Sequence, residues 1–311
     1  MNDLRAAIAD YLDLRRSLGF KLETDERYLR NFAAFMERRH ATHITIKLAE
    51  KWARQPASTT PNYHVGRLRA VRSFARYRVH TDPHTEIPPT ELLPRQRAVF
   101  EPHIYSKEEI ERILAGSWRQ WAGATWFYCL GRYTIYGLLS VTGMRVGEVL
   151  NLDIDDVDLD QGVITIRNTK FGKSRIVPVH ETTRIVLQRY RDERDAFLNG
   201  RMVKAFFISA HGRRIIHEAL ERAFRRLSKR IGMRGISDIT GPRLHDLRHT
   251  MAVEVLRRSY ATGADPERRL PALSTYLGHT NLSHTYWYLH QNPELMTEAV
   301  ARLQHRWEAS A

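Results

Sequence analysis

The chain has 311 residues, of which 42% are hydrophobic and 10% aromatic, so a disordered chain is excluded and two domains with separate cores are allowed. The net charge of +14 indicates a polyanionic partner, with nucleic acid as the first candidate and an anionic membrane as the second. The single cysteine, Cys129, excludes an internal disulfide and fits a reducing cytoplasm, and the N-terminus lacks the apolar core of a signal peptide.

Four helices are predicted in residues 1–80, where apolar residues recur at helical spacing. They are expected from Leu4 to Gly19, from Thr24 past Met36, from Thr45 to Arg54 and from Pro61 to Val79. On the fourth helix Leu68, Val71 and Phe74 share an inward face. Its other face carries five arginines, namely Arg67, Arg69, Arg72, Arg76 and Arg78. These residues therefore predict a small helical domain with basic faces.

A proline-rich stretch follows at 81–104. Pro83, Pro88, Pro89 and Pro94 stand among few residues at core-forming spacing, which predicts an extended linker. Ser106 then fits an N-cap and Glu109 the third position of a new helix. A second domain is therefore expected over residues 105–311.

The second domain is expected to be mainly helical with a small antiparallel sheet. The apolar segment from Trp126 to Val141 contains Arg132 and is short for a membrane span, so a buried helix is predicted. Alternation of apolar and polar residues predicts strands at 153–158 and 163–167. A third strand is expected at 175–179, and 205–209 is a candidate for a further one. Further helices are expected at 181–198, 217–231 and 294–307. The predicted fold class is mainly α with a small antiparallel β-sheet (α+β).

Three short strings in this domain carry side chains suited to phosphodiester cleavage. They are Thr142–Glu148, His245–His249, and Leu277–His279 with Tyr288 nine positions later. Attack on an anionic phosphodiester needs fixed positive charge, which the planar forks of two arginines, Arg145 and Arg248, can supply. His245 lies three residues before Arg248 on a helix, shares its face, and suits acid–base work on a tyrosine proton. His279 can donate a hydrogen bond to a nonbridging oxygen.

Two choices remain open on spacing alone. A lysine can protonate the departing sugar oxygen if phosphates and arginines lower its pKa, and both Lys170 and Lys173 lie on the turn between two expected strands. Tyr286 and Tyr288 differ by roughly 200° on a helix, so only one of them can face the phosphate. His249 lies off the face shared by His245 and Arg248 and is assigned to packing or solvent.

No metal or nucleotide cofactor is predicted. The chain has no HExxH motif, no cysteine at zinc spacing, no P-loop and no paired dinucleotide fingerprint. The aspartates between Asp153 and Asp158 are assigned to the outer face of a strand, because they alternate with apolar residues.

These strings resemble the motifs of the tyrosine recombinases, or phage integrase family. Thr142–Leu150 is similar to the first arginine box of that family, and Leu244–His249 to the second. Leu277–His279 and Tyr288 resemble the third box and the nucleophile, which favours Tyr288 over Tyr286. Thr169–Pro178 resembles the lysine hairpin, in which the earlier lysine, Lys170, is the catalytic one. Glu148 matches the acidic residue that supports the first arginine.

The resemblance implies a site-specific DNA recombinase that works without metal or ATP, for integration or excision of a mobile element. Tyr288 would form a 3′-phosphotyrosyl link and release a 5′-hydroxyl. Residues 1–80 would be the helical core-binding domain. The expected DNA contacts are Arg67, Arg69, Arg72, Arg76 and Lys173. The expected partners are a double-stranded recombination site and further copies of the chain, two per site and four in a synapse, or related recombinases of the same element. The expected location is the bacterial cytoplasm, on the nucleoid.

Other features bear on the subgroup. Tyr286–Met296 resembles integrases of transposons and recombinase-in-trio elements. The polar stretch 261–269 is longer than the usual link between the second and third boxes, and no arm-binding domain precedes the core-binding helices. The terminal helix, 294–307, has an apolar side that can pack on its own domain or on a neighbouring subunit.

Two alternatives remain beside the recombinase. A type IB topoisomerase uses a similar set of arginine, lysine, histidine and tyrosine, and supercoil relaxation without a preferred sequence would indicate it. A DNA-binding accessory subunit that no longer cuts is expected to lack one catalytic side chain, whereas every matched position here is filled.

Overall fold

The computed structural model describes residues 2–55, 60–94, 102–118, 126–167, 174–238, 240–262 and 266–278, with residues 281, 285, 296, 297, 300, 301, 304, 307 and 308 beyond them. The chain divides into two compact units, one formed by residues 1–100 and the other by residues 101–169 and 173–311. Each has its own hydrophobic core.

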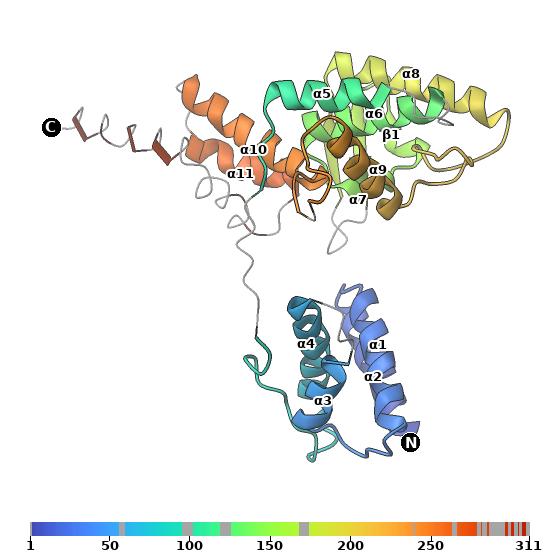
Figure 1. Ribbon diagram of the computed structural model, residues 1–311, viewed down its shortest axis with the longest axis vertical. Coiled ribbons are helices and arrows are strands. Elements are labelled where there is room, and N and C mark those ends of the chain that lie inside the picture. The colour runs from blue at the N-terminus through green and yellow to red at the C-terminus, as the bar shows by residue number, and fades with distance from the viewer. Residues whose placement is uncertain are drawn as a thin grey trace. The chain divides into compact units, whose positions relative to one another are not determined.

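The first unit consists of four helices, as the apolar spacing predicted. They are α1 (Asn2–Ser17), α2 (Glu23–Glu37), α3 (Ile46–Ala53) and α4 (Pro61–Arg78) (Figure 1). Thr45 caps α3 by accepting a hydrogen bond from the Leu48 amide. The core is aromatic at its centre, where the fully buried rings of Phe32 and Trp52 meet edge to face at 5.1 Å.

The arginines of α4 do not form the single exposed face that the sequence predicted. Arg67 is 6% exposed, donates to the Trp52 carbonyl at 2.9 Å, and lies over the Trp52 ring at 3.8 Å. Arg72 is 7% exposed and donates to the carbonyls of Pro88 and Pro89. The prediction of a solvent-facing position is therefore wrong for Arg67 and Arg72, because both guanidiniums satisfy backbone carbonyls inside the unit. Arg69 and Arg76 are exposed.

The proline-rich stretch is held against the first unit as far as Leu93. Glu86 accepts a hydrogen bond from the Ile46 amide, and its own amide donates to the Ile44 carbonyl. Leu93 is 5% exposed and belongs to the core of the four helices. Residues 81–94 contain no helix or strand, but they are packed rather than free up to Leu93.

The second unit is mainly helical with one small sheet, which confirms the predicted fold class. Its helices are α5 (Lys107–Trp118), α6 (Trp126–Thr142), α7 (Val146–Leu150), α8 (Glu181–Leu198), α9 (His217–Arg230), α10 (Leu244–Ala261) and α11 (Pro266–Leu277). The strands β1 (Val157–Asp158), β2 (Val163–Ile166) and β3 (Arg175–Pro178) form an antiparallel sheet in the order β1-β2-β3, with Ile164 opposite Val177.

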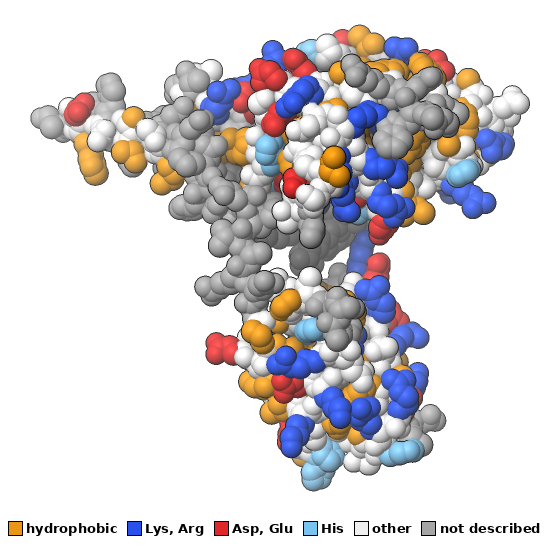
Figure 2. Space-filling model, in the orientation of Figure 1, with side chains coloured by type: hydrophobic (Ala, Val, Ile, Leu, Met, Phe, Trp, Pro, Cys, Tyr) orange, Lys and Arg blue, Asp and Glu red, His pale blue; other side chains and the backbone are white. Residues whose placement is uncertain are grey.

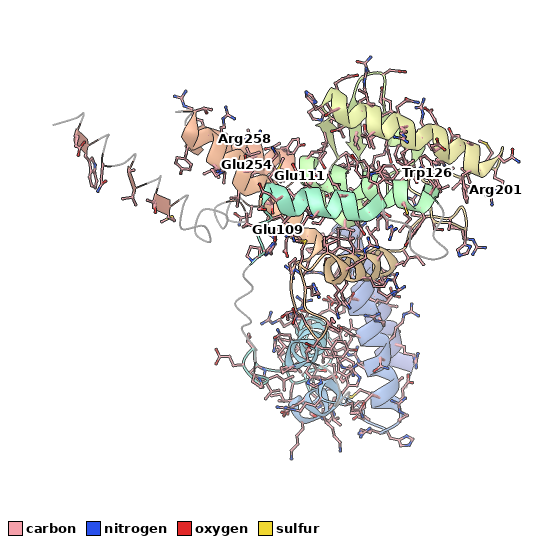
Figure 3. The ribbon with its side chains drawn as sticks, turned by 45° about the horizontal axis from the view of Figure 1, so that its top comes forward. Glu109, Glu111, Trp126, Arg201, Glu254 and Arg258 are labelled. Atoms are coloured by element: carbon pink, nitrogen blue, oxygen red, sulfur yellow. The ribbon has the colours of Figure 1, made fainter. Side chains whose placement is uncertain are left out.

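Helix α6 lies at the centre of this unit, as its apolar sequence predicted. It packs between α5, α8 and α10, and residues such as Ile135 and Leu139 are almost fully buried (Figure 1). Within the described ranges, no helix combines the length and the apolar character needed to cross a membrane. The outer surfaces are charged: Glu254 and Arg258 form an exposed ion pair one turn apart on α10 (Figure 3), and lysines and arginines are spread over the visible face of each unit (Figure 2).

Two predicted strands are much shorter than expected. Half of 153–158 is a 3-10 turn, Ile154–Asp156, because Asp153 and Asp156 cap its backbone reciprocally. Residues 205–209 contribute only the isolated bridges Asp153–Ala205 and Ile208–Arg214. Two aspartates of this segment form ion pairs, Asp153 with Arg214 and Asp156 with Arg167. The predicted outer-face position is wrong for Asp156, which is 7% exposed because its carboxylate caps the turn.

Candidate active site

Arg145 stands at the N-terminus of α7 and joins two distant parts of the second unit. Its amide and its Nη1 donate to opposite oxygens of Glu148, both at 2.8 Å, which forms a capping box with a charged side chain. Its Nη2 donates to the carbonyl of Gly278 at 3.2 Å. The side chain is still 38% exposed, so a ligand can reach this guanidinium.

The turn before Arg145 depends on Gly143. This residue has a φ of +60°, and a β-carbon there would lie 3.1 Å from both Leu277 and Met251. Glycine therefore allows the first string to pack directly against α10 and α11, which carry the second and third strings.

Arg248 connects all three strings from inside. It is 2% exposed, and its Nη1 donates to the Gly143 carbonyl at 2.7 Å while its Nη2 donates to the Leu277 carbonyl at 2.8 Å. The predicted convergence of Arg145 and Arg248 is thus visible in their hydrogen bonds, since they hold the adjacent carbonyls of Gly278 and Leu277.

Glu148 is shared between Arg145 and an arginine that the sequence analysis did not single out, Arg175. Arg175 donates Nη1 to Oε1 at 3.0 Å and Nη2 to Oε2 at 2.7 Å. Burial by itself would raise the pKa of the Glu148 carboxyl, but hydrogen bonds and charge from Arg175 and Arg145 lower it below the ordinary value. Glu148 is therefore an anion that holds two guanidiniums.

His245 lies one turn before Arg248 on α10. Burial lowers the pKa of this imidazole, and the nearby charges of Arg248, Arg243 and Arg145 lower it further, against an opposing effect of Asp246. The ring is consequently neutral at pH 7 and can accept a proton. His249 meets this ring edge to face at 4.9 Å. The prediction that His249 lies off the face of His245 is therefore wrong, because residues four apart on a helix are neighbours on one face.

The N-terminus of α10 is fixed from two sides. Asp246 is buried and accepts hydrogen bonds from the amide and the side chain of Arg243. Tyr105 donates its hydroxyl to the Arg243 carbonyl at 2.8 Å and its amide to the Thr250 hydroxyl at 2.9 Å. These contacts hold the turn that presents His245 in one orientation.

Several predicted site residues lie outside the described residues. They are Lys170, Lys173, His279, Tyr286 and Tyr288. The structure describes Gly278, the residue directly before His279. After the turn that contains Lys170 and Lys173, the described residues begin again at Ser174. No group of three or more metal-ligating side chains occurs among the residues that the structure describes.

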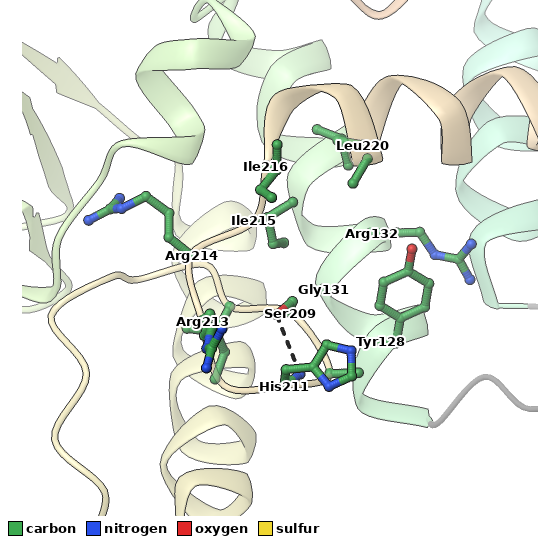
Figure 4. Close-up of a pocket in the computed structure, with 13 residues that line it drawn as sticks. Tyr128, Gly131, Arg132, Ser209, His211, Arg213, Arg214, Ile215, Ile216 and Leu220 are labelled. Atoms are coloured by element: carbon green, nitrogen blue, oxygen red, sulfur yellow. Dashed lines mark hydrogen bonds between the residues drawn. The ribbon is translucent and has the colours of Figure 1, made fainter.

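A cavity of about 600 Å³ lies elsewhere in the second unit (Figure 4). It is bounded by α6, the segment 208–216 and the start of α9, with Tyr128, Arg132, Ile208 and Leu220 in its wall. None of the predicted site residues lines it, and most of its wall is apolar. It is therefore separate from the arginine cluster.

Helix α9 has a basic face that the sequence analysis did not mark. Arg222, Arg225 and Arg226 are exposed, while Phe224 and Leu227 on the opposite side are buried. The signal was present as an arginine repeat at helical spacing.

Comparison with known proteins agrees with the geometry. The model of the phage integrase family matches residues 105–294. The protein y4rB of Sinorhizobium fredii, named as an integrase/recombinase, is 46% identical over 99% of this chain and 99% of its own length. Tyrosine recombinase XerD of Listeria monocytogenes is 26% identical over 93% of this chain and 94% of its own length.

Solved structures show the same fold. The Tn1549 transposon integrase in complex with transposon right end DNA aligns with a TM-score of 0.66, at 16% identity, over 96% of this chain and 98% of that chain. The site-specific recombinase XerH bound to its palindromic difH substrate aligns with a TM-score of 0.63, at 18% identity, over 91% and 80% of the two chains.

Proposed function

Since this chain belongs to the phage integrase family and is a tyrosine recombinase, we propose that it cuts and rejoins DNA at a specific site of a mobile element, with Tyr288 as the nucleophile. The observation that carries the proposal is the double tether of the third string. Arg145 binds the Gly278 carbonyl and Arg248 binds the Leu277 carbonyl, so both guanidiniums are tied to the two residues that precede His279 in the sequence.

The arginines are assigned to the phosphate. Arg145, whose guanidinium is accessible, stabilises the charge that develops on the nonbridging oxygens when the phenolate attacks, and His279 donates a further hydrogen bond. Arg248 is assigned to the same phosphate by its place in the second motif; because its guanidinium is buried and bonded to the carbonyls of Gly143 and Leu277, this contact requires that Arg248 exchange or share those hydrogen bonds. His245 in its neutral form accepts the phenol proton. Lys170 gives a proton to the departing 5′-oxygen. The product is a 3′-phosphotyrosyl bond, and a 5′-hydroxyl of another strand reverses the step without ATP because the phosphodiester energy is kept.

The pH dependence of cleavage follows from His245. Because its pKa lies below the ordinary 6.5, the neutral base persists to lower pH than a normal histidine would allow. We expect a single-turnover cleavage rate that falls with acidification through a midpoint below 6.5. His245→Gln should slow cleavage by about 10²–10⁴-fold and remove that midpoint. A midpoint that persists in the variant would belong to another group.

DNA contact by the first unit is proposed through the exposed arginines of α4. Arg69→Gln and Arg76→Gln should each reduce the slope of log affinity against log salt by about one, because each removes one phosphate contact. Arg67→Gln and Arg72→Gln serve as matched controls, since both side chains are buried and should leave the slope unchanged. Unchanged slopes for Arg69→Gln and Arg76→Gln as well would contradict the proposal that these two side chains contact DNA phosphates. Lys173 and the exposed α9 residues Arg222 and Arg225 are proposed contacts of the second unit.

The assembly is proposed by analogy with the DNA-bound relatives. Two copies would occupy one site and four would form the synapse, with related recombinases of the same element as further partners, in the bacterial cytoplasm on the nucleoid. The sequence predicted domain limits of 1–80, 81–104 and 105–311. Because Leu93 belongs to the core of the first unit, we propose that this domain extends to Leu93 and that the connection begins after it.

A nicked suicide substrate tests the proposal. On such DNA the 5′-hydroxyl fragment diffuses away, so a recombinase accumulates as a covalent adduct. Adduct formation at one preferred sequence supports the proposal. Relaxation of supercoils without sequence preference would indicate a type IB topoisomerase, and binding with no adduct would indicate an accessory subunit.

A further inference from the structure

We propose that Arg175 is a positioning residue that fixes Glu148, and thereby aims Arg145 at the scissile phosphate. The inference rests on the proposed function of Arg145. It starts from the position of Arg175 at the first residue of β3, five residues after Lys170 and opposite Ile166 on β2.

The first support is the saturation of the Glu148 carboxylate. It accepts two hydrogen bonds from Arg145 and two from Arg175, which together use its full accepting capacity of about four lone pairs. The Arg175 side chain is 12% exposed and that of Arg145 is 38% exposed. The two guanidiniums therefore have unequal access to a ligand: Arg145 is the outward one and Arg175 the inward one.

The second support is the contact of Arg175 with Gly278. A β-carbon on Gly278 would lie 2.7 Å from Nη1 and 3.1 Å from Cζ of Arg175, and this glycine has a φ of +68°. The Arg175 guanidinium thus packs on the residue whose carbonyl Arg145 binds. Because Glu148 holds the Arg175 guanidinium by both Nη atoms, this guanidinium cannot move away from Gly278 without breaking those hydrogen bonds.

The charges explain why a second arginine is useful. Glu148 and Arg145 alone would form a neutral pair, so the Glu148 carboxylate would offset the positive charge with which Arg145 stabilises the phosphate. With Arg175 the cluster carries one net positive charge, and the outward member is Arg145. Arg175 also begins the strand β3, so one side chain links this strand to Glu148 of the first string and Gly278 of the third.

The test measures single-turnover cleavage of nicked DNA and, separately, the dissociation constant of uncleaved DNA. Arg175→Gln should slow cleavage by about 10–100-fold, the range found for residues that orient a reactive group, while the dissociation constant changes by less than about twofold because the side chain is inward. Arg175→Lys should lose about tenfold, since it keeps the charge but not the fork. Arg167→Gln is the control. This neighbouring arginine pairs with Asp156 and not with Glu148, so the variant should cleave DNA at the wild-type rate.

A double-mutant cycle separates positioning from simple stabilisation. In a Glu148→Gln background, adding Arg175→Gln should slow cleavage by less than about a further threefold, because the carboxylate that Arg175 orients is already gone. Three outcomes would each overturn the proposal. They are independent, multiplicative rate losses in the double variant, a wild-type cleavage rate for Arg175→Gln, and a rate loss that follows the folded fraction in urea titration. Absence of any adduct with the wild-type chain would instead overturn the proposed function.

Discussion

Tyr288→Phe is expected to abolish covalent adduct formation, with a loss of at least about 10⁴-fold, while specific DNA binding remains within about twofold of wild type. The substitution removes only the hydroxyl that attacks phosphorus. Arg145, Arg248 and the exposed arginines that hold phosphates are unaffected. The measurement is the yield of adduct on nicked DNA by denaturing electrophoresis, with binding followed by mobility shift on intact DNA.

Tyr286→Phe is the matched control for this prediction. It removes the same group two residues earlier, about 200° away on a helix, and should leave adduct formation close to wild type. The reverse pattern, with Tyr286→Phe inactive and Tyr288→Phe active, would move the nucleophile to Tyr286 and leave the arginine cluster as described.

Arg248→Ala is expected to damage both chemistry and folding, whereas Arg145→Ala should damage chemistry alone. Arg248 is buried and satisfies the carbonyls of Gly143 and Leu277, so its loss should lower the free energy of unfolding by about 2–5 kcal/mol. Arg145 is partly exposed and Glu148 keeps Arg175 as a partner, so its loss should cost about 1 kcal/mol or less. Each should reduce cleavage by at least about 10²–10³-fold.

Urea titration of the full chain, together with single-turnover cleavage of the folded fraction, distinguishes these effects. Arg248→Lys provides the control for charge, because an ammonium can reach one carbonyl but cannot bridge two. Equal destabilisation by Arg145→Ala and Arg248→Ala would contradict the assignment of Arg248 as the internal tie between the three strings.

Local spacing accounts for much of what the sequence predicted correctly. Glu148 lies three residues after Arg145, and His245 three before Arg248, so each pair shares one turn of helix and its relation can be read from the sequence. The apolar run of α6 likewise identified a buried helix. The hydrogen bonds of Arg248 with the carbonyls of Gly143 and Leu277 were not predicted, because they join residues 105 and 29 positions apart in the chain.

The burial of Arg67 and Arg72 could not be read from spacing. Both lie at the border of the apolar face of α4, where a long side chain can turn either way. Their direction depends on carbonyls that other segments supply, those of Trp52, Pro88 and Pro89. A sequence pattern marks the face of a helix, but it does not show which carbonyl groups another segment presents to that helix.

Arg175 was missed for a similar reason. In a strand of four residues, alternation predicts the side on which it points, but its partners Glu148 and Gly278 come from other elements. The prediction of a strand over all of 153–158 was wrong for a different reason. Its aspartates alternate like strand residues, but two of them cap a 3-10 turn.

The most direct test of the central claim is to digest the adduct trapped on nicked DNA and to identify the nucleotide-linked peptide by mass spectrometry. We predict a single modified peptide that carries a 3′-phosphate linkage on Tyr288. A linkage to any other residue, or to a 5′-phosphate, would contradict the account.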